Sequence, residues 1–423
     1  MKKKILVLAD APNCNSGFGK VTNSILKEVY KQGDCEIDIV GINHDGTPYD
    51  KKEYPYNIYP ARNSLIPRYN DYFGRQLFLD LLVKNDYDVV WILQDTFNVH
   101  QIGEQILQIK KEKNFKWIYY FPIDVTPEKE WIEKSVLLAD YPVAYTKYGR
   151  DECLKVLDEA NRIELRSKLK VIYHGTNSED FYDLKWTDKE MKAVRTMLFG
   201  EENTDKFIFM NINRNQPRKD IFSSMLACKK MRSIDKDSFF YFHMQIQDES
   251  GMDMLSVGDQ LGIKIGKDWA YPNPKVMMSH SFDIRIVNEL YNAVDCVFST
   301  TLGEGWGLST TEAMATKTPV VIPRNTSAEE IIGEGKNKRG LLVDCGIEEN
   351  LLIANRYDNN RIRPKVDMLS LEEELSFVKK NINEITPIID NAYKWVKSYE
   401  WSGEKVGAKW IELFNKAYEK KYL

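Results

Sequence analysis

Short apolar runs alternate with amphipathic segments along the first part of the chain. The runs are rich in valine, isoleucine and aromatic residues, which predicts buried strands at residues 5–9, 37–42, 89–93, 117–121, 143–145 and 171–173. Apolar side chains recur at helical spacing between them, at residues 21–30, 73–83, 131–138 and 151–157. Strands that alternate with helices in this way predict a parallel sheet covered by helices.

The alternation breaks once and then resumes. Polar and acidic residues fill positions 175–186, and the following Thr187-Asp188-Lys189-Glu190 predicts the capping box of a new helix. Later strand-like runs lie at 207–212, 239–244, 296–300, 319–322 and 341–343, with helical segments at 221–231 and 283–294. We therefore expect one α/β domain over residues 1–180 and a second over residues 186–390.

The pattern becomes wholly helical after residue 370. In the last segment Trp410, Phe414 and Tyr418 share one face with Ile411 and Ala417, so this helix must bury that face against a partner. We expect residues 391–423 to form a helical tail that packs back on the first domain.

The composition is that of a soluble globular protein, with 43% apolar and 29% charged residues. A formal net charge of −4 gives no overall attraction to nucleic acid or anionic membranes. The six cysteines form no C-x-x-C pair, which argues against disulfides and structural zinc. The basic start resembles a signal peptide, but its apolar run is too short, so we expect a first strand and a cytoplasmic protein without membrane spans.

Three glycines and two glutamates mark the stretch 303–312. Gly303, Gly305 and Gly307 follow an expected strand, and a helix is expected to begin directly after them. Glycines let backbone N–H groups approach a ligand closely, and the amino end of a helix favours anions. Glu304 and Glu312 add carboxylates, so the stretch suits a ligand with both phosphates and hydroxyls.

Arg214 and Lys219 lie five residues apart, directly after the expected strand at 207–212. The carboxyl ends of parallel strands are where α/β domains bind ligands, and both cations suit phosphate. In isolation such a pair is more often a solvated basic turn. Its occurrence together with the stretch 303–312 favours a phosphate site instead.

These motifs together resemble glycosyltransferase family 4, a large family of retaining enzymes that use nucleotide diphosphate sugars and have the GT-B fold. The family signature is an arginine and a lysine five apart, then a Glu-x7-Glu motif, which Arg214, Lys219, Glu304 and Glu312 match. Further similarity covers residues 171–177, 288–295, 318–321 and Trp401. The resemblance implies two Rossmann-like domains that face a cleft, with the tail returning to the first domain.

The resemblance also implies roles for individual residues. Arg214 and Lys219 would hold the donor diphosphate and stabilise its growing charge, while Glu304 would contact sugar hydroxyls as the third catalytic residue. Glu312 would accept hydrogen bonds from the ribose hydroxyls. The donor-binding residues implied are Gly17, Gly19, Gly305, Trp306, Gly307, Leu308 and Glu312.

The loop around Gly17 and Gly19 allows two interpretations. Gly17-x-Gly19 is a weak match to a dinucleotide fingerprint, because the glycines lie several residues beyond the expected strand end. It looks more like the N-terminal glycine loop of the family, which borders the donor phosphates. The alternative is an ordinary turn between a strand and a helix.

Asp95, Asp124 and His174 are candidate contacts for the donor sugar or the acceptor. Relatives commonly have histidines near the first two positions, and this chain has none there. Asp124 either takes that role or caps a turn. His174 stands where the family motif usually has asparagine, so a structural role is as plausible as a functional one.

No metal site is expected. Asp86-Tyr87-Asp88 matches the D-x-D string of metal-dependent transferases but runs directly into an expected strand, and the five histidines show no HExxH spacing. The only co-substrate expected is a nucleotide diphosphate sugar, with UDP-sugar preferred over GDP- or ADP-sugar. Residues 276–280 are the candidate base-binding region.

The first functional hypothesis is retaining transfer of a sugar to an acceptor hydroxyl. A glycosidase would also use two carboxylates, but it has little need of a cationic diphosphate clamp. An isomerase or hydrolase of nucleotide sugars and a non-catalytic nucleotide-sugar binder remain alternatives. Segments of the first domain resemble bacteriophage and bacterial glycosyltransferases, so the acceptor is a saccharide, a lipid-linked sugar or a hydroxymethylated base in DNA.

Overall fold

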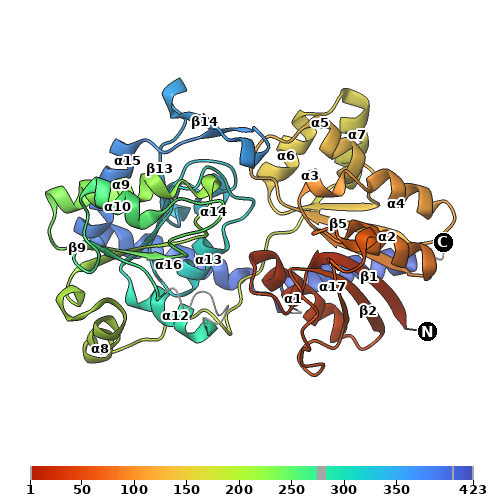
Figure 1. Ribbon diagram of the computed structural model, residues 1–423, viewed down its shortest axis with the longest axis horizontal. Coiled ribbons are helices and arrows are strands. Elements are labelled where there is room, and N and C mark those ends of the chain that lie inside the picture. Colours follow the sequence, from red (N-terminus) through yellow and green to blue (C-terminus); the bar gives the residue numbers. More distant parts are fainter. Residues whose placement is uncertain (1, 274–282, 403, 422–423) are drawn as a thin grey trace. The chain divides into compact units, whose positions relative to one another are not determined.

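The computed structural model describes residues 2–273, 283–402 and 404–421. It divides into two compact units (Figure 1): unit 1 is Met1–Gly175 with Tyr399–Leu423, and unit 2 is Thr176–Ser398. Each unit is built on one parallel sheet, with seven strands in unit 1 and six in unit 2. The predicted α/β architecture with two Rossmann-like domains is confirmed.

The sheet of unit 1 has the strand order β3-β2-β1-β4-β5-β6-β7. Most of its strands are the apolar runs of the sequence, because both faces of a parallel sheet are buried. The strands are β1 (Lys3–Asp10), β2 (Cys35–Ile42), β3 (Asn57–Pro60), β4 (Val89–Leu93), β5 (Lys116–Phe121), β6 (Tyr141–Ala144) and β7 (Lys170–Val171).

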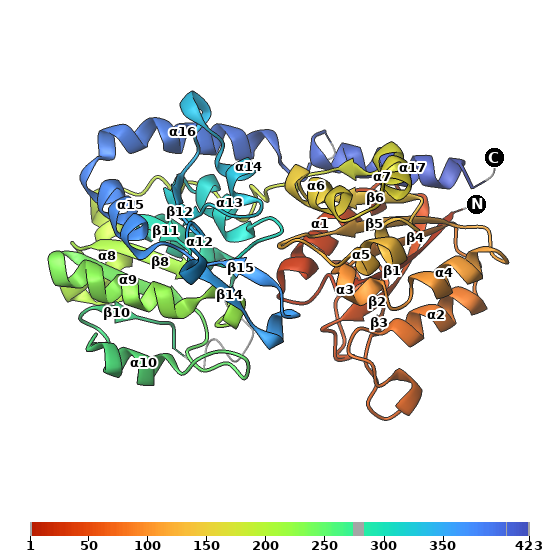
Figure 2. The same ribbon diagram turned by 90° about the horizontal axis from the view of Figure 1, so that it is seen from above.

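Helices cover both faces of this sheet, as Figure 2 shows with α2 and α4 on one side and α17 on the other. Side chains alternate accordingly, since Val90 and Trp117 join the core beneath α2 and α4, whereas Trp91 and Tyr120 contact α17. The helices are α1 (Gly17–Tyr30), α2 (Arg75–Lys84), α3 (Thr96–Val99), α4 (Gly103–Lys110), α5 (Lys129–Trp131), α6 (Lys147–Lys155), α7 (Glu159–Lys168) and α17 (Val406–Glu419).

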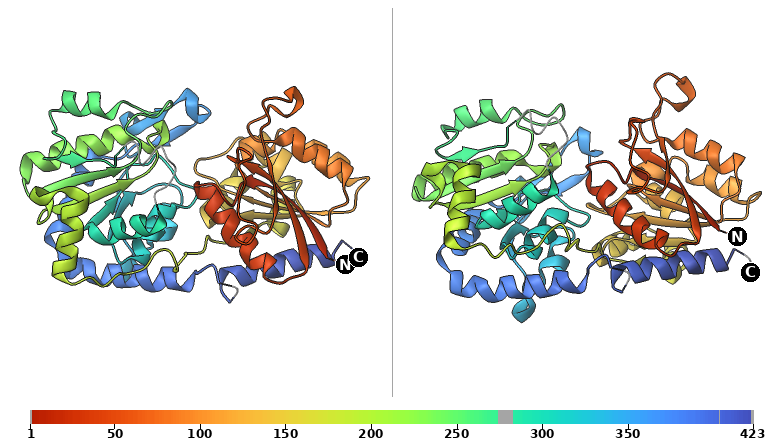
Figure 3. Two further views of the ribbon diagram at one scale, coloured as in Figure 1. Left: turned by 60° about the horizontal axis from the view of Figure 1, so that its bottom comes forward. Right: turned by 90° about the horizontal axis from the view of Figure 1, so that it is seen from below.

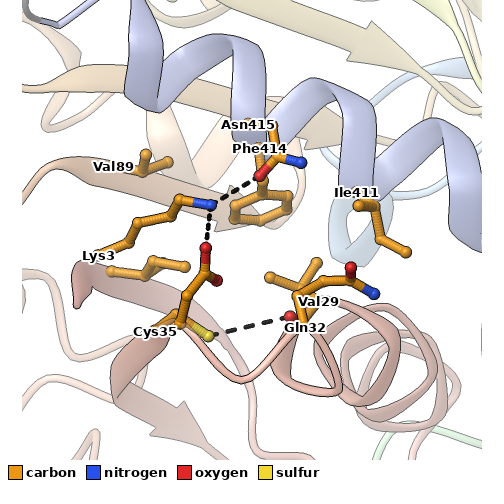
Figure 4. Close-up of a pocket in the computed structure, with 10 residues that line it drawn as sticks. Lys3, Val29, Gln32, Cys35, Val89, Ile411, Phe414 and Asn415 are labelled. Atoms are coloured by element: carbon orange, nitrogen blue, oxygen red, sulfur yellow. Dashed lines mark hydrogen bonds and ion pairs between the residues drawn. The ribbon is translucent and has the colours of Figure 1, made fainter. Parts of the chain in front are cut away.

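Helix α17 is tied to the start of the chain. Figure 3 shows it beside β1 and α1, and the fully buried Trp410 packs edge-on against Trp91. At the seam in Figure 4, the Lys3 ammonium donates to the Asp34 carboxylate (2.6 Å) and to the Asn415 amide oxygen (2.8 Å). The void there is about 10 Å³, which leaves scarcely room for one water. The predicted return of the tail to the first domain is confirmed.

The sheet of unit 2 has the order β10-β9-β8-β11-β12-β13. Its strands are β8 (Phe207–Ile212), β9 (Ser238–His243), β10 (Trp269–Ala270), β11 (Cys296–Phe298), β12 (Val320–Pro323) and β13 (Leu341–Val343). A separate antiparallel pair consists of β14 (Leu352–Ala354) and β15 (Ile362–Pro364). The helices are α8 (Asp188–Phe199), α9 (Ile221–Ile234), α10 (Met254–Leu261), α12 (Ile284–Ala293), α13 (Leu308–Ala315), α14 (Ala328–Ile332), α15 (Met368–Lys380) and α16 (Ile382–Ser398).

Helix α8 begins with the predicted capping box, in which Thr187 and Glu190 satisfy each other's backbone amides. At the far end of the unit, α16 stays in unit 2 until Ser398 because it packs against α13. Residues 391–398, which the sequence analysis assigned to the tail, therefore belong to the second unit. None of the helices in the described ranges is long and apolar enough to span a membrane.

In each sheet the order of the strands reverses at one position, the switch point. In unit 1 the strand order reverses between β1 and β4, and in unit 2 it reverses between β8 and β11. Loops that leave neighbouring strands at such a switch point run to opposite faces of the sheet and open a crevice at its carboxyl edge. In unit 2 these are the loops that carry Lys219 and Glu304.

Candidate active site

The loop after β8 ends in a 3-10 turn, Pro217–Lys219, followed by α9. Asp220 adopts the left-handed conformation (φ 44°) and caps α9, and its carboxylate accepts a hydrogen bond from the Ser223 hydroxyl at 2.6 Å. This tight turn places the Lys219 side chain over the loop that follows β11. The side chain is only 12% exposed and forms an ion pair with Glu304.

The loop after β11 is fixed to its surroundings by backbone hydrogen bonds. The Leu302 amide donates to the Arg218 carbonyl at 2.8 Å, which joins this loop to the preceding one. The Glu304 amide donates to the Thr326 hydroxyl at 2.9 Å, and the Ser327 hydroxyl donates to the Glu304 carbonyl at 2.8 Å. Glu304 is therefore held from both sides before any ligand binds.

Two cations surround the Glu304 carboxylate. Lys219 pairs with one oxygen, and Arg218 Nη1 lies 3.4 Å from the other while it donates to the Gly303 carbonyl. Burial opposes ionisation of Glu304, but the charges of Lys219 and Arg218 outweigh it and lower the pKa to about 2. Glu304 is consequently an anion at neutral pH, and Arg218 is a site residue that the sequence analysis missed.

Arg214 lies apart from this group. Its side chain is 72% exposed, and its guanidinium is 3.6 Å from the Asp248 carboxylate in the loop after β9. The sequence analysis assigned Arg214 and Lys219 to the donor diphosphate, and for Arg214 this assignment stays a prediction. The residue whose side chain shares the Glu304 carboxylate with Lys219 is Arg218.

The glycine loop ends at Gly307, which adopts φ 94° and precedes α13. A residue with a β-carbon would be strained there, so glycine allows the sharp entry into the helix. Trp306 turns into the domain, where its indole is 4% exposed and stacks on Trp395 of α16. The first amides of a helix have no preceding turn to supply their acceptors. In α13 the Thr310 amide donates to the Gly307 carbonyl at 3.0 Å.

Glu312 lies on α13, as predicted. The Tyr291 hydroxyl donates to its carboxylate at 2.8 Å, and the backbone of Tyr291 is held by the Thr318 hydroxyl at 2.7 Å. Burial, with the nearby charge of Glu312, raises the pKa of Tyr291 well above its ordinary value. Tyr291 thus remains a neutral donor that orients Glu312. The predicted base-binding region, 276–280, lies outside the described residues.

The glycine loop of unit 1 surrounds a buried carboxylate. Asp10, the last residue of β1, accepts hydrogen bonds from the Ser16 hydroxyl (2.5 Å) and the Asn43 amide (2.9 Å), and burial raises its pKa. Ser16 also accepts from the Gly19 amide at 2.9 Å, and Gly17 is the first residue of α1. The sequence analysis missed Asp10, although its position at a strand end was a usable signal.

The three remaining candidates lie in unit 1. Asp95 precedes α3 and Asp124 follows β5, so both half-buried aspartates lie at the carboxyl edge of the sheet. His174 is 2% exposed, its Nδ1 is 2.6 Å from the Tyr120 hydroxyl, and burial lowers its pKa to about 3. Trp401 from the tail packs against the His174 ring. This enclosure favours a structural role for His174.

The D-x-D string is engaged in ion pairs. The Asp86 carboxylate is 2.7 Å from Lys113, and the Asp88 carboxylate is 2.5 Å from Lys421 and accepts from the Lys4 amide at 2.8 Å. These contacts give both aspartates structural partners. Within residues 2–273, 283–402 and 404–421, no group of three or more potential ligands converges on a metal position.

A cavity of about 330 Å³ lies elsewhere in unit 2. Its lining includes Phe207 at the start of β8, Asp295 directly before β11 and Pro319 directly before β12. These residues mark the amino edge of the sheet, opposite the loops that carry Lys219 and Glu304. The cavity is therefore separate from the candidate active site.

Residues 272–354 match the family model described as glycosyl transferases group 1. The matched segment includes Glu304, the glycine loop and Glu312. A comparison with curated protein sequences finds no match.

Solved structures resemble the whole chain. HepE from Anabaena in complex with UDP-glucose is 13% identical with a TM-score of 0.67, and covers 98% of this chain and 99% of its own. The fold is GT-B. Sucrose-phosphate synthase from Thermosynechococcus elongatus is 14% identical (TM-score 0.71; 99% and 100% covered), and a glycosyltransferase from Rickettsia africae is 16% identical (TM-score 0.69; 100% and 99% covered). The GT-B fold and the family match together support a glycosyltransferase.

Proposed function

We propose that the protein is a retaining glycosyltransferase that moves a sugar from a nucleotide diphosphate sugar to an acceptor hydroxyl. The observation that carries this proposal is the pairing of Lys219 and Arg218 with Glu304 at the switch point of unit 2. Cations at that position suit a diphosphate, and a carboxylate beside them suits sugar hydroxyls.

Transfer would form a bond between the acceptor oxygen and C1 of the sugar and break the bond between C1 and the diphosphate. The electron pair stays on the diphosphate oxygen, where Lys219 stabilises the growing negative charge. With retention, the acceptor approaches on the side of the leaving group, so its proton passes to the departing diphosphate. This route requires no protein nucleophile.

The donor we propose is a UDP-sugar, because HepE, which has a similar fold, is described in complex with UDP-glucose. We also propose that transfer needs no metal, since Lys219 and Arg218 already supply positive charge at the phosphate position. The six cysteines are free thiols, which suits a reducing compartment such as the cytoplasm.

We assign the acceptor to unit 1, where Asp10, Ser16 and Asn43 form a hydrogen-bonded group at the switch point. A saccharide, a lipid-linked sugar or a hydroxymethylated DNA base would each present the required hydroxyl. Hydrolysis or isomerisation of the donor without an acceptor, and binding without turnover, are the competing functions.

Thermal unfolding with UDP-, GDP- and ADP-sugars tests the donor, since a ligand held by the folded state raises Tm by mass action. We expect one nucleotide class to raise Tm, and transfer to a matching acceptor to give a product with the donor's anomeric configuration. Release of free sugar at the same rate with and without acceptors would establish a hydrolase instead. If no nucleotide sugar raises Tm, the proposal is wrong.

A further inference from the structure

The cavity of about 330 Å³ at the amino edge of the unit 2 sheet has walls that hydrogen bonds fix in place. The Asn292 side chain accepts from the Leu184 amide at 2.9 Å and donates to the Tyr182 carbonyl at 3.0 Å. These bonds fasten the segment before α8 to α12. On another side, the Asp295 carboxylate accepts from the Ile208 amide at 2.8 Å. The walls are therefore in place before any ligand binds.

Apolar side chains that are only half-buried line this cavity. They include Trp186, Met191, Phe207 and Ile389. Sites for small molecules have volumes of this order and are mostly apolar, with a few polar groups that fix orientation. A ring placed between these side chains would remove their remaining apolar surface from water, which favours binding.

The ionisable groups at the cavity leave one positive charge without a counter-ion. Asp183 pairs with Lys317 at 3.0 Å, and Asp295 pairs with Arg195 at 2.7 Å. Lys185 also lines the cavity, and no carboxylate in the described ranges forms an ion pair with it. The cavity therefore favours a ligand that carries one negative charge.

Both lysines of the lining have a left-handed backbone, with φ 52° at Lys185 and φ 61° at Lys317. This conformation is uncommon for lysine and costs free energy, so the surrounding structure must impose it. At Lys185 the backbone amide donates to the Asp183 carboxylate at 3.0 Å. Strained residues of this kind cluster at ligand sites, which agrees with a binding role for this part of the lining.

We propose that the cavity is a binding site for a small organic acid, a molecule with one aromatic or alicyclic ring system and one carboxylate. The ring would lie against Trp186 and Phe207, and the carboxylate would meet the Lys185 ammonium. The site is separate from the loops that carry Lys219 and Glu304, and the proposal does not depend on sugar transfer.

Both segments that connect unit 2 to unit 1 border this site. Residues 176–187 follow the end of the first part of unit 1, and α16 ends at Ser398, directly before unit 1 resumes. Figure 3 shows these two segments side by side, and each contributes residues to the lining. A bound acid would therefore hold both connecting segments more rigidly.

Calorimetry of the full chain with 2-naphthoate tests the proposal, with 2-naphthalenemethanol as the uncharged counterpart. We expect 2-naphthoate to bind with a Kd of about 1 mM or below, as for a ligand of this size. The alcohol should bind about three- to tenfold more weakly, the range for a partly exposed charged contact. Lys185→Gln should weaken 2-naphthoate binding by the same factor and leave binding of the alcohol unchanged.

The control, Lys189→Gln, removes an exposed lysine of α8 that does not line the cavity, and it should change neither affinity. Ile389→Trp fills the cavity and should abolish binding of both compounds. Equal losses of 2-naphthoate affinity in Lys185→Gln and Lys189→Gln would overturn the proposal, as would equal binding of the acid and the alcohol to wild type.

Hydrogen exchange shows where the acid binds. In wild type, 2-naphthoate should slow exchange in peptides from residues 176–187 and from α16, and leave residues 303–312 unchanged. Slower exchange at 303–312 alone would place the acid at the candidate active site and overturn the proposal. Wild type that does not bind 2-naphthoate at about 10 mM, tenfold above the expected Kd, would overturn it as well.

Discussion

Units 1 and 2 have the same parallel strand order around their switch points, but the two points differ in charge. In unit 2, Lys219 and Arg218 hold Glu304 as an anion, with a pKa lowered to about 2. In unit 1, Asp10 is enclosed without a cation among its hydrogen-bond donors Ser16 and Asn43, and burial raises its pKa. One topology therefore supports two electrostatic environments, which the side chains of a few loop residues decide.

This difference agrees with a division of labour between the units. A diphosphate leaving group needs fixed positive charge, because charge accumulates on it as the bond breaks. An acceptor hydroxyl needs neutral or weakly charged hydrogen-bonding groups that orient it. On this view unit 2 binds the donor and unit 1 binds the acceptor, and changes at either switch point should alter different steps.

The largest effect is expected for Lys219→Met. Removing a preorganised charge next to the leaving group should lower kcat/KM for sugar transfer by about 10²- to 10³-fold. The exposed Lys229 on the following helix α9 provides the control, and Lys229→Met should retain full activity. If the Lys219→Met variant transferred sugar at the wild-type rate with a matched donor and acceptor, the positive charge at the switch point of unit 2 would have no role in catalysis.

A double variant separates charge pairing from chemistry. Lys219→Met leaves Glu304 without its closest cation, which costs stability as well as activity. The double variant with Lys219→Met and Glu304→Gln lacks both charges, so its Tm should return toward the wild-type value. Its sugar transfer activity should remain lost. Recovery of activity together with stability would show that Lys219 acts only through the fold.

The pH dependence of stability should have opposite signs in the two units. The folded-state pKa of Glu304 lies below its ordinary value, so its ionisation stabilises the fold above pH 4.5 and this contribution is lost as pH falls toward 2. The lost stabilisation is at most about 3 kcal/mol. The pKa of Asp10 is raised, so its contribution is present at low pH and is lost as pH rises through that raised value.

Isosteric variants test whether the pH dependence of stability has opposite signs in the two units. The Glu304→Gln variant should lose less stability than wild type as pH falls from 5 to 3. The Asp10→Asn variant should lose less stability than wild type as pH rises from 4 to 7. Hydrogen exchange of peptides from β8 and β1 reports each unit separately, which avoids assuming that a two-domain chain unfolds in one step. Shifts of the same sign in both units would contradict the electrostatic contrast.

Two glycines occupy equivalent positions, each as the third residue of its helix. Gly19 and Gly149 each donate a backbone hydrogen bond to the residue that caps their helix, Ser16 or Thr146. A β-carbon at Gly19 would lie 2.7 Å from the Cys14 carbonyl oxygen, whereas at Gly149 the nearest atom is 3.3 Å away. Gly19→Ala should therefore cost about 1–3 kcal/mol in urea unfolding.

The control, Gly149→Ala, should stay within about 1 kcal/mol of wild type, because better helix propensity offsets the mild crowding. Equal losses would mean that the close approach around Gly19 relaxes without cost. A loss confined to Gly19→Ala would explain why the loop after β1 requires glycine, independently of any ligand.

The sequence predicted the buried strands well and the exposed ones poorly. Strands β1, β4, β5 and β8 are continuous apolar runs because helices cover both faces. Edge strands β3 and β10 and the pair β14 and β15 were missed, and β10 has only two residues although its Trp269 is buried. All three residues of β14 are exposed, so no core imposed an apolar pattern on them.

At the site, residue types were predictable but side-chain directions were not. Lys219 and Glu304 were identified by their motifs and by the family resemblance, and the structure brings them together. Arg218, which contacts the Gly303 carbonyl and Glu304, lies in a 3-10 turn that precedes a left-handed Asp220, and the spacing of residues in the sequence contains no such information. His174 is similar, since the ring that covers it belongs to Trp401, more than two hundred positions later in the chain.

The smallest effect is expected for Glu312→Gln, which tests the division of roles inside unit 2. Glutamine keeps an oxygen that can accept from Tyr291, so the helix and its packing should be unchanged. Loss of the negative charge should weaken hydrogen bonds from ribose hydroxyls by about 1 kcal/mol, or roughly fivefold in the Kd for UDP, with kcat unaltered. Glu329→Gln, at an exposed position on α14, should leave Kd and kcat at wild-type values. If Glu312→Gln lowered kcat while Kd stayed constant, Glu312 would act in the chemical step, and the assignment of the ribose to it would be wrong.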